Sequence, residues 1–122
     1  MTEAYELYQE GRRRLKGGMA AQATVPLEKA KGLEPEKASI REALGLAYFR
    51  IQRWDKAESE FRAMLELAPT DDWAHYALGR TLEKQGRQHE ANGEYKLASA
   101  LRPQSEQYRE RILDLDGDAD AD

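Results

Sequence analysis

The sequence of 122 residues contains no cysteine, so disulfides, thiolate nucleophiles and cysteine-ligated zinc are excluded. Histidine occurs only at His75 and His89, and neither belongs to a metal-binding spacing such as HExxH. The sequence also lacks a Gly-rich phosphate loop and any recognisable pairing of a nucleophile with a base. We therefore expect no enzyme activity, no cofactor and no bound metal.

Long hydrophobic runs and a surplus of positive charge are also missing. No apolar run approaches the roughly 18 residues of a membrane helix, and the first residues, MTEAYELYQEG, lack the basic and apolar regions of a secretory signal. The 19 Lys and Arg residues are outnumbered by 23 Asp and Glu residues, whereas a nucleic-acid binder needs the opposite balance to displace phosphate counterions. These features predict a soluble, cytoplasmic protein with neither nucleic acid nor membrane as its partner.

What the sequence does contain is an internal period of 34 residues. Six columns of similar residues share this period: Gly11, Gly45 and Gly79; Ala23, Ala57 and Ala91; Leu27, Phe61 and Tyr95; Ala30, Met64 and Ala98; Leu33, Leu67 and Leu101; and Pro35, Pro69 and Pro103. The glycine and first alanine columns let two helices approach closely, and the large residues of the Leu27 column fill the space between helices. Each proline ends a helix, because it lacks the amide hydrogen and clashes with the preceding turn.

The second repeat, ALGLAYFRIQRWDKAESEFRAMLELAP, strongly resembles the tetratricopeptide repeat (TPR). The residues that stand at the expected places of this family are Leu44, Gly45, Tyr48, Trp54, Ala57, Phe61 and Pro69. The third repeat matches nearly as well. The first departs from the pattern at Arg14, where an aromatic residue is usual, and at Pro26, where we expect a kink inside the second helix.

The resemblance covers residues 4 to about 105 and implies an all-α fold, an α-α superhelix (TPR solenoid). The predicted domain spans 1–115, with helix-turn-helix repeats at 4–37, 38–71 and 72–105, a C-terminal capping helix at 106–115 and a disordered acidic tail at 116–122. Within the repeats we expect helices over 3–16, 20–32, 38–51, 55–67, 72–84 and 88–101. The capping helix places Tyr108, Ile112 and Leu115 on one apolar face, and the tail has nothing apolar to bury.

In TPR proteins the first helix of each repeat lines a concave groove, and the resemblance implies the same here. Read at helical steps of three and four, the groove-facing stripes are Tyr5, Tyr8, Arg12, Leu15 and Lys16; Ser39, Glu42, Leu46, Phe49 and Arg50; and Trp73, Tyr76, Arg80, Glu83 and Lys84. The stripes combine aromatic residues with five cations against two anions, and aromatic residues and arginine are enriched at binding hot spots.

These stripes predict a non-enzymatic adaptor or scaffold that binds a protein or peptide with acidic side chains or a free carboxylate. The residues expected to contact the peptide are Tyr5, Tyr8, Arg12, Leu46, Phe49, Arg50, Trp73, Tyr76, Arg80 and Lys84. One subtype of the family is excluded. Its chaperone-binding members hold a C-terminal carboxylate with Lys and Asn residues, in columns that here contain Tyr8, Arg12, Ala43, Trp73 and Ala77.

Two alternatives stay open. Aromatic residues at helical spacing also occur in protein cores, where the aromatic residues of the stripes would pack rather than bind. The irregular first repeat would also suit a self-assembling structural protein, a weak homo-oligomer in which another copy covers Tyr5 and Tyr8.

Overall fold

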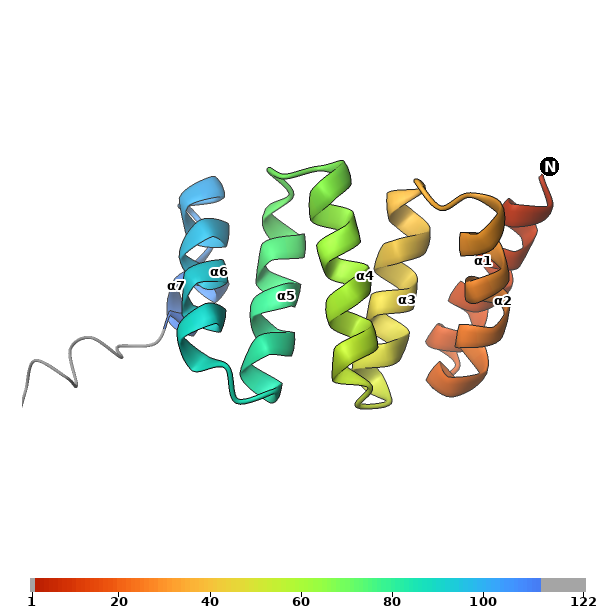
Figure 1. Ribbon diagram of the computed structural model, residues 1–122, viewed down its shortest axis with the longest axis horizontal. Coiled ribbons are helices and arrows are strands. Elements are labelled where there is room, and N and C mark those ends of the chain that lie inside the picture. Colours follow the sequence, from red (N-terminus) through yellow and green to blue (C-terminus); the bar gives the residue numbers. More distant parts are fainter. Residues whose placement is uncertain (1, 113–122) are drawn as a thin grey trace, which may run out of the picture. The chain divides into compact units, whose positions relative to one another are not determined.

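The computed structural model describes residues 2–112, and these residues form seven helices and no strand (Figure 1). They belong to two compact units, residues 1–69 (unit 1) and 70–122 (unit 2). Unit 1 contains α1 (Glu3–Lys16), α2 (Ala20–Leu33), α3 (Ala38–Arg50) and α4 (Trp54–Leu67), and unit 2 contains α5 (Asp72–Lys84), α6 (Gln88–Leu101) and α7 (Glu106–Arg111). The predicted all-α fold is confirmed, and α1 to α6 begin and end within one residue of the predicted helices. The single domain over 1–115 stays a prediction.

The two helices of each repeat are joined by a tight turn with one residue in the left-handed backbone region. These residues are Gly18 (φ 77°), Gln52 (φ 62°) and Gly86 (φ 80°), which again lie 34 positions apart. Glycine reaches this region without a steric clash, whereas Gln52 is the one non-glycine residue with positive φ in the described part of the chain. The turn is therefore a property of the repeat rather than of glycine alone.

The close approach of the two helices in each repeat occurs at the glycine column. A Cβ atom built on Gly79 of α5 would lie 2.6 Å from Cε1 of Tyr95 in α6, far inside the normal contact distance of carbon atoms. Tyr95 is fully buried, so its ring has little room to move aside. The same relation joins Gly11 to Leu27 and Gly45 to Phe61. The packing of the two helices in each repeat therefore depends on a glycine in the first helix opposite a large side chain in the second.

A buried carboxylate, that of Glu60 in α4, ties three helices of unit 1 together. Glu60 is only 4% exposed and accepts hydrogen bonds from Lys31 Nζ of α2 and Arg41 Nη1 of α3, both at 2.9 Å. A buried carboxylate is tolerated when cations and hydrogen bonds satisfy it in this way. The network links the second helix of repeat 1 to both helices of repeat 2.

The two columns that hold this arginine–glutamate pair change their chemistry from repeat to repeat. In repeat 3 they hold His75 and Glu94, whose Nδ1 and Oε1 atoms lie 2.7 Å apart. In repeat 1 they hold Leu7 and Pro26, which carry no charge. The helix pairs therefore share one shape but differ in how they are joined electrostatically.

The two departures of the first repeat from the family pattern, Arg14 and Pro26, compensate each other. α2 continues without a break through Pro26. Because proline lacks an amide hydrogen, it cannot donate to the carbonyl oxygen of Gln22 four residues earlier. Arg14 Nη1 donates to that oxygen at 2.8 Å, and Arg14 Nη2 pairs with Glu10 on its own helix. The arginine therefore supplies the hydrogen bond that the proline removes.

The short helix α7 covers one side of unit 2. Tyr108 is 6% exposed, packs on the ring of Tyr76 with 5.1 Å between centroids, and donates to Asp72 Oδ2 at 2.7 Å. Burial and the Asp72 carboxylate together raise the pKa of Tyr108 to about 12. Although burial opposes ionisation of Asp72, the hydrogen bonds from Tyr108 and Arg102 lower the pKa of this carboxyl group. Tyr108 therefore joins α7 to α5 through both its ring and its hydroxyl group.

The capping helix is shorter than the predicted range of 106–115. It ends at Arg111, since Ile112 has an extended backbone (φ −63°, ψ 121°). Leu115, which was expected on its apolar face, and the predicted acidic tail at 116–122 both lie outside the described residues.

We expect Gly79→Ala to lower the free energy of unfolding by about 1–2 kcal/mol, because the added methyl group collides with the buried ring of Tyr95. Gly93→Ala is the matched control. Gly93 lies in α6 with nothing within 4 Å of an added Cβ, so alanine should raise the free energy of unfolding by up to about 1 kcal/mol. Urea denaturation followed by circular dichroism measures both, and equal stabilisation by the two variants would contradict the close approach.

The compensation between Arg14 and Pro26 predicts a coupling between their substitutions. Arg14→Ala should cost about 1 kcal/mol of unfolding free energy in the natural chain, because the carbonyl of Gln22 loses its partner. In the background of Pro26→Ala, the cost of Arg14→Ala should fall by about half or more, since the new amide of residue 26 donates to the carbonyl oxygen of Gln22. Arg13→Ala, at the exposed neighbouring position, should show no coupling. An undiminished cost of Arg14→Ala in the alanine background would refute the compensation.

Candidate functional site

The first helices of repeats 1 and 2, α1 and α3, lie side by side and point the same way. Residues at the start of α1 and at the start of α3 line one pocket, among them Tyr5 and Ile40. At the other end, Arg50 Nη1 at the close of α3 donates to the carbonyl oxygen of Leu15, near the close of α1, at 3.0 Å. The starts of α1 and α3 therefore lie next to each other, and so do their ends. The two helices form one continuous surface of unit 1, here called the α1–α3 face.

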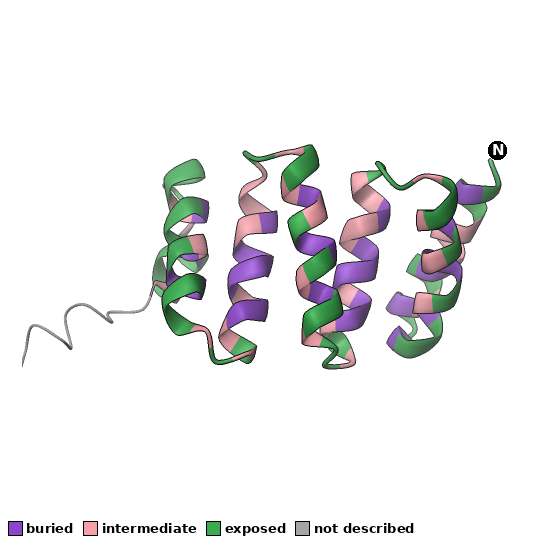
Figure 2. Cartoon of the chain, in the orientation of Figure 1, coloured by how far each residue is buried: buried purple, intermediate pink, exposed green. Residues whose placement is uncertain are grey.

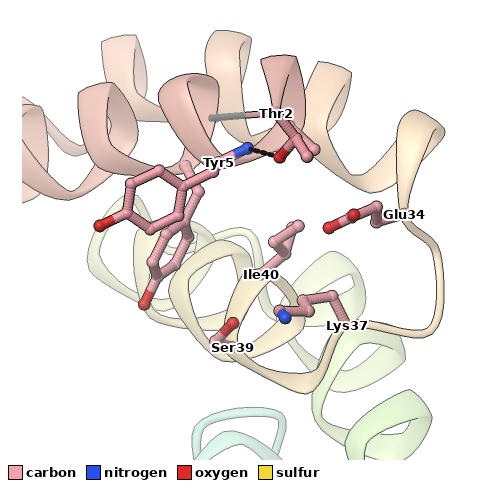
Figure 3. Close-up of a pocket in the computed structure, with 8 residues that line it drawn as sticks. Thr2, Tyr5, Glu34, Lys37, Ser39 and Ile40 are labelled. Carbon is pink, nitrogen blue, oxygen red and sulfur yellow. Dashed lines mark hydrogen bonds between the residues drawn. The ribbon is translucent and has the colours of Figure 1, made fainter.

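A pocket of about 270 Å³ opens at the start of this face (Figure 3). Its lining residues are Thr2, Ala4, Tyr5, Tyr8, Glu34, Lys37, Ser39 and Ile40. Thr2 caps α1 by accepting a hydrogen bond from the Tyr5 amide at 3.1 Å, which fixes where the first turn begins. Tyr5 is 43% exposed, whereas Ala4 and Ile40 are buried. We call this cavity the Tyr5 pocket.

Cations gather at the opposite end of the α1–α3 face. Arg12 is exposed, and its guanidinium carbon lies 5.8 Å from the centroid of the Tyr8 ring. Lys16 and Arg50 are exposed as well. Arg50 bonds to the last turn of α1 through Nη1, and a guanidinium group carries several further N–H donors. Arg12, Lys16 and Arg50 are called the basic end of the face.

Two further predicted contact residues of α3 are less accessible. Leu46 is half-buried. The ring of Phe49, also half-buried, packs edge-on against Trp54 with 5.0 Å between centroids and an interplanar angle of 70°. Phe49 therefore belongs in part to the cluster that joins α3 to α4, as the alternative of aromatic core packing anticipated.

In unit 2, the prediction that Tyr76 contacts a peptide at the surface is wrong. Tyr76 is 7% exposed, because the ring of Tyr108 covers it and Gln107 Nε2 donates to its hydroxyl oxygen at 3.0 Å. Arg80 also donates to this oxygen at 3.3 Å and lies 6.0 Å from the ring centroid. Burial works to raise the pKa of Tyr76, but the hydrogen bonds from Arg80 and Gln107 outweigh it and lower the pKa. Trp73 is half-buried.

Exposure along each helix is summarised in Figure 2, where buried, intermediate and exposed residues alternate along the first six helices. Lys84 is exposed at the end of α5, and Arg80 is half-buried one turn earlier. The columns of the chaperone-type clamp contain Ala43 and Ala77, each 5% exposed. Buried alanines at these places offer no donor to a carboxylate, in agreement with the absence of the clamp.

Sequence reasoning missed the contribution of the loop between α2 and α3. Glu34 and Lys37 of this loop complete the rim of the Tyr5 pocket, as Figure 3 shows. The proline column contains the relevant signal, because Pro35 ends the second helix of repeat 1 at the same end of unit 1 where α1 begins. Reading the loop together with the start of α1 would have found the pocket.

Residues 2–112 contain no group of three or more side chains placed to hold a metal ion, and none of the helices in this range is long and apolar enough to cross a bilayer. Of the two histidines, His75 is bound to Glu94 and His89 is exposed on α6.

Comparison with known proteins bears on these features. Residues 38–81 match the tetratricopeptide repeat family. A stretch of 79 residues, 64% of the chain, is 35% identical to Protein O-mannosyl-transferase Tmtc2 of Drosophila melanogaster. The chain spans only 8% of the length of that relative.

Solved structures share the fold. The first TPR of Spaghetti (RPAP3), bound to the HSP90 peptide SRMEEVD, has a TM-score of 0.85 at 21% identity and covers 90% of this chain and 87% of its own. A crystal structure of MamA has a TM-score of 0.86 at 22% identity, and the match covers 89% of this chain and 64% of the MamA chain. The family match at residues 38–81, the 34-residue period and these likenesses agree with one another. Residues 38–81 therefore match a tetratricopeptide repeat, and the described helices share the fold of the RPAP3 TPR domain.

Proposed function

We propose that this protein is a non-enzymatic interaction module, a cytoplasmic adaptor whose α1–α3 face binds a peptide segment of a partner protein. The observation that carries the proposal is that the Tyr5 pocket and the basic end lie at the two ends of one accessible face of unit 1. Aromatic and arginine side chains are the residue types that dominate binding energy at protein interfaces. The TPR fold itself supports an interaction module rather than an enzyme.

The charge of the face favours an acidic peptide. The basic end contributes Arg12, Lys16 and Arg50, whose donors pair best with carboxylates. The HSP90 peptide bound to the RPAP3 neighbour, SRMEEVD, contains two Glu and one Asp beside Met and Val, which supports the same class of ligand. Two of the clamp columns hold the buried alanines Ala43 and Ala77, so recognition here would depend on acidic side chains or a terminal carboxylate at the basic end, which includes Arg12.

The residues of unit 2 enter the proposal differently. Trp73, Arg80 and Lys84 stay proposed contacts, whereas Tyr76 is removed because α7 covers its ring. We therefore assign the primary contact to unit 1, where the pocket and the cations lie on the same pair of helices.

Self-assembly through Tyr5 and Tyr8 stays the second prediction. It was suggested by the irregular first repeat, but Arg14 and Pro26 satisfy each other within the chain. The exposed ring of Tyr5 suits a peptide as well as it suits a second copy. The adaptor is therefore the function that the face supports better, because it also uses the cations.

A charge reversal tests the proposed function. Arg12→Glu should weaken the binding of acidic peptides, measured on an array of Asp- and Glu-containing sequences, by about tenfold, which corresponds to about 1.4 kcal/mol. Arg13→Glu is the matched control, because it makes the same change of charge at the next residue, about 100° round the helix and off the face. If the two variants weaken binding equally, net charge rather than the α1–α3 face determines affinity, and the proposal fails.

A further inference from the structure

The Tyr5 pocket has room for one large apolar side chain and walls that suit it. At about 270 Å³ it is smaller than the cavities of about 300–1,000 Å³ that hold small-molecule ligands. The rings of Tyr5 and Tyr8 form walls, and the buried residues Ala4 and Ile40 contribute apolar surface. Polar groups stand among the lining residues at Thr2, Ser39, Glu34 and Lys37, where the backbone of an extended peptide could be held.

Charge separates the two ends of the face. The first turn of α1 carries Glu3 and Glu6, both exposed, and Glu34 belongs to the pocket. These carboxylates disfavour an acidic side chain at the pocket, although Lys37 partly offsets them. The basic end has the opposite character. The face therefore selects an apolar group at one end and an acidic group at the other.

The helix fixes the distance between these groups. Arg12 lies seven positions after Tyr5 and Lys16 lies eleven positions after it, which at about 1.5 Å per residue gives roughly 10–17 Å. An extended peptide advances about 3.3 Å per residue. The acidic residue therefore falls about three to five positions from the apolar one.

We infer that the α1–α3 face recognises an extended peptide in which one large apolar side chain enters the Tyr5 pocket and an acidic side chain three to five positions away contacts the basic end. This inference rests on the proposed function and gives it a ligand pattern. It specifies spacing, which a merely cationic surface does not. Arg12, stacked on Tyr8, connects the two parts of the site.

Fluorescence anisotropy with labelled Gly/Ser-based dodecapeptides tests the pattern. Each peptide carries one Leu and one Asp-Asp pair, separated by one, four or eight positions and in both chain orders. In the better order, the spacing of four should bind about tenfold more tightly than either other spacing and than a peptide with Ala in place of Leu. Affinity that does not depend on spacing overturns the inference.

A variant of the pocket supplies the second measurement. Tyr5→Ala should weaken binding of the Leu peptide with the spacing of four about tenfold and leave binding of its Ala counterpart unchanged. Leu67→Ala is the control, since Leu67 is 42% exposed on α4 against 43% for Tyr5 and lies outside the pocket. Circular dichroism verifies that both variants keep their helical content. Equal loss for the Leu and Ala peptides on Tyr5→Ala overturns the pocket assignment.

The outcomes separate the two levels of the argument. If acidic peptides bind and Arg12→Glu weakens them, but Leu, spacing and Tyr5 have no effect, the pattern is wrong and the proposed function stands. If none of the acidic peptides binds, or if Arg12→Glu leaves their affinity unchanged, the proposed function itself fails and the inference fails with it.

Discussion

The contact on which the rest of this structure depends is that of a glycine in the first helix of each repeat with a large side chain in the second. Gly79 against Tyr95 shows the geometry: any side chain at the glycine would occupy the space of the ring. Close packing of this kind brings the two helix backbones together and fixes their rotation about their own axes. Rotation in turn decides which residues of the first helix face away from the partner helix. Arg12, one residue after Gly11, is turned by about 100° from that contact and so reaches the surface.

The first repeat shows how a departure from a repeat pattern can be absorbed without loss of the fold. Pro26 removes one backbone donor, and Arg14 provides another from the neighbouring helix. Each residue looks unfavourable when it is compared with its own column. Together they keep α2 continuous and leave Gly11 in contact with Leu27, as in the regular repeats.

The sequence allowed most of the fold to be predicted, because one period of 34 residues repeats both the packing contacts and the helix ends. Prediction succeeded less well where contacts do not repeat. Tyr76 belongs to a stripe by its spacing, but Tyr108 of the non-repeated helix α7 covers it. The Tyr5 pocket was also missed, since Glu34 and Lys37 come from a loop, whereas the stripes were read along helices. Periodicity identifies the face of a helix, but it does not identify what comes to lie on that face.

The changing pairs at the Arg41–Glu60 and His75–Glu94 columns bear on how the chain avoids mispairing. Three helix pairs with the same glycine contact could exchange partners while folding, because the shape of the contact is nearly the same in each. Were α1 to pair with α4, Leu7 would stand opposite Glu60 where Arg41 belongs, and that carboxylate would be buried with one cation fewer. Losing a partner of a buried charge costs several kcal/mol, on the order of 3–5. The electrostatic difference between these otherwise equivalent columns therefore disfavours the pairing of α1 with α4, although the shape of the contact would allow it.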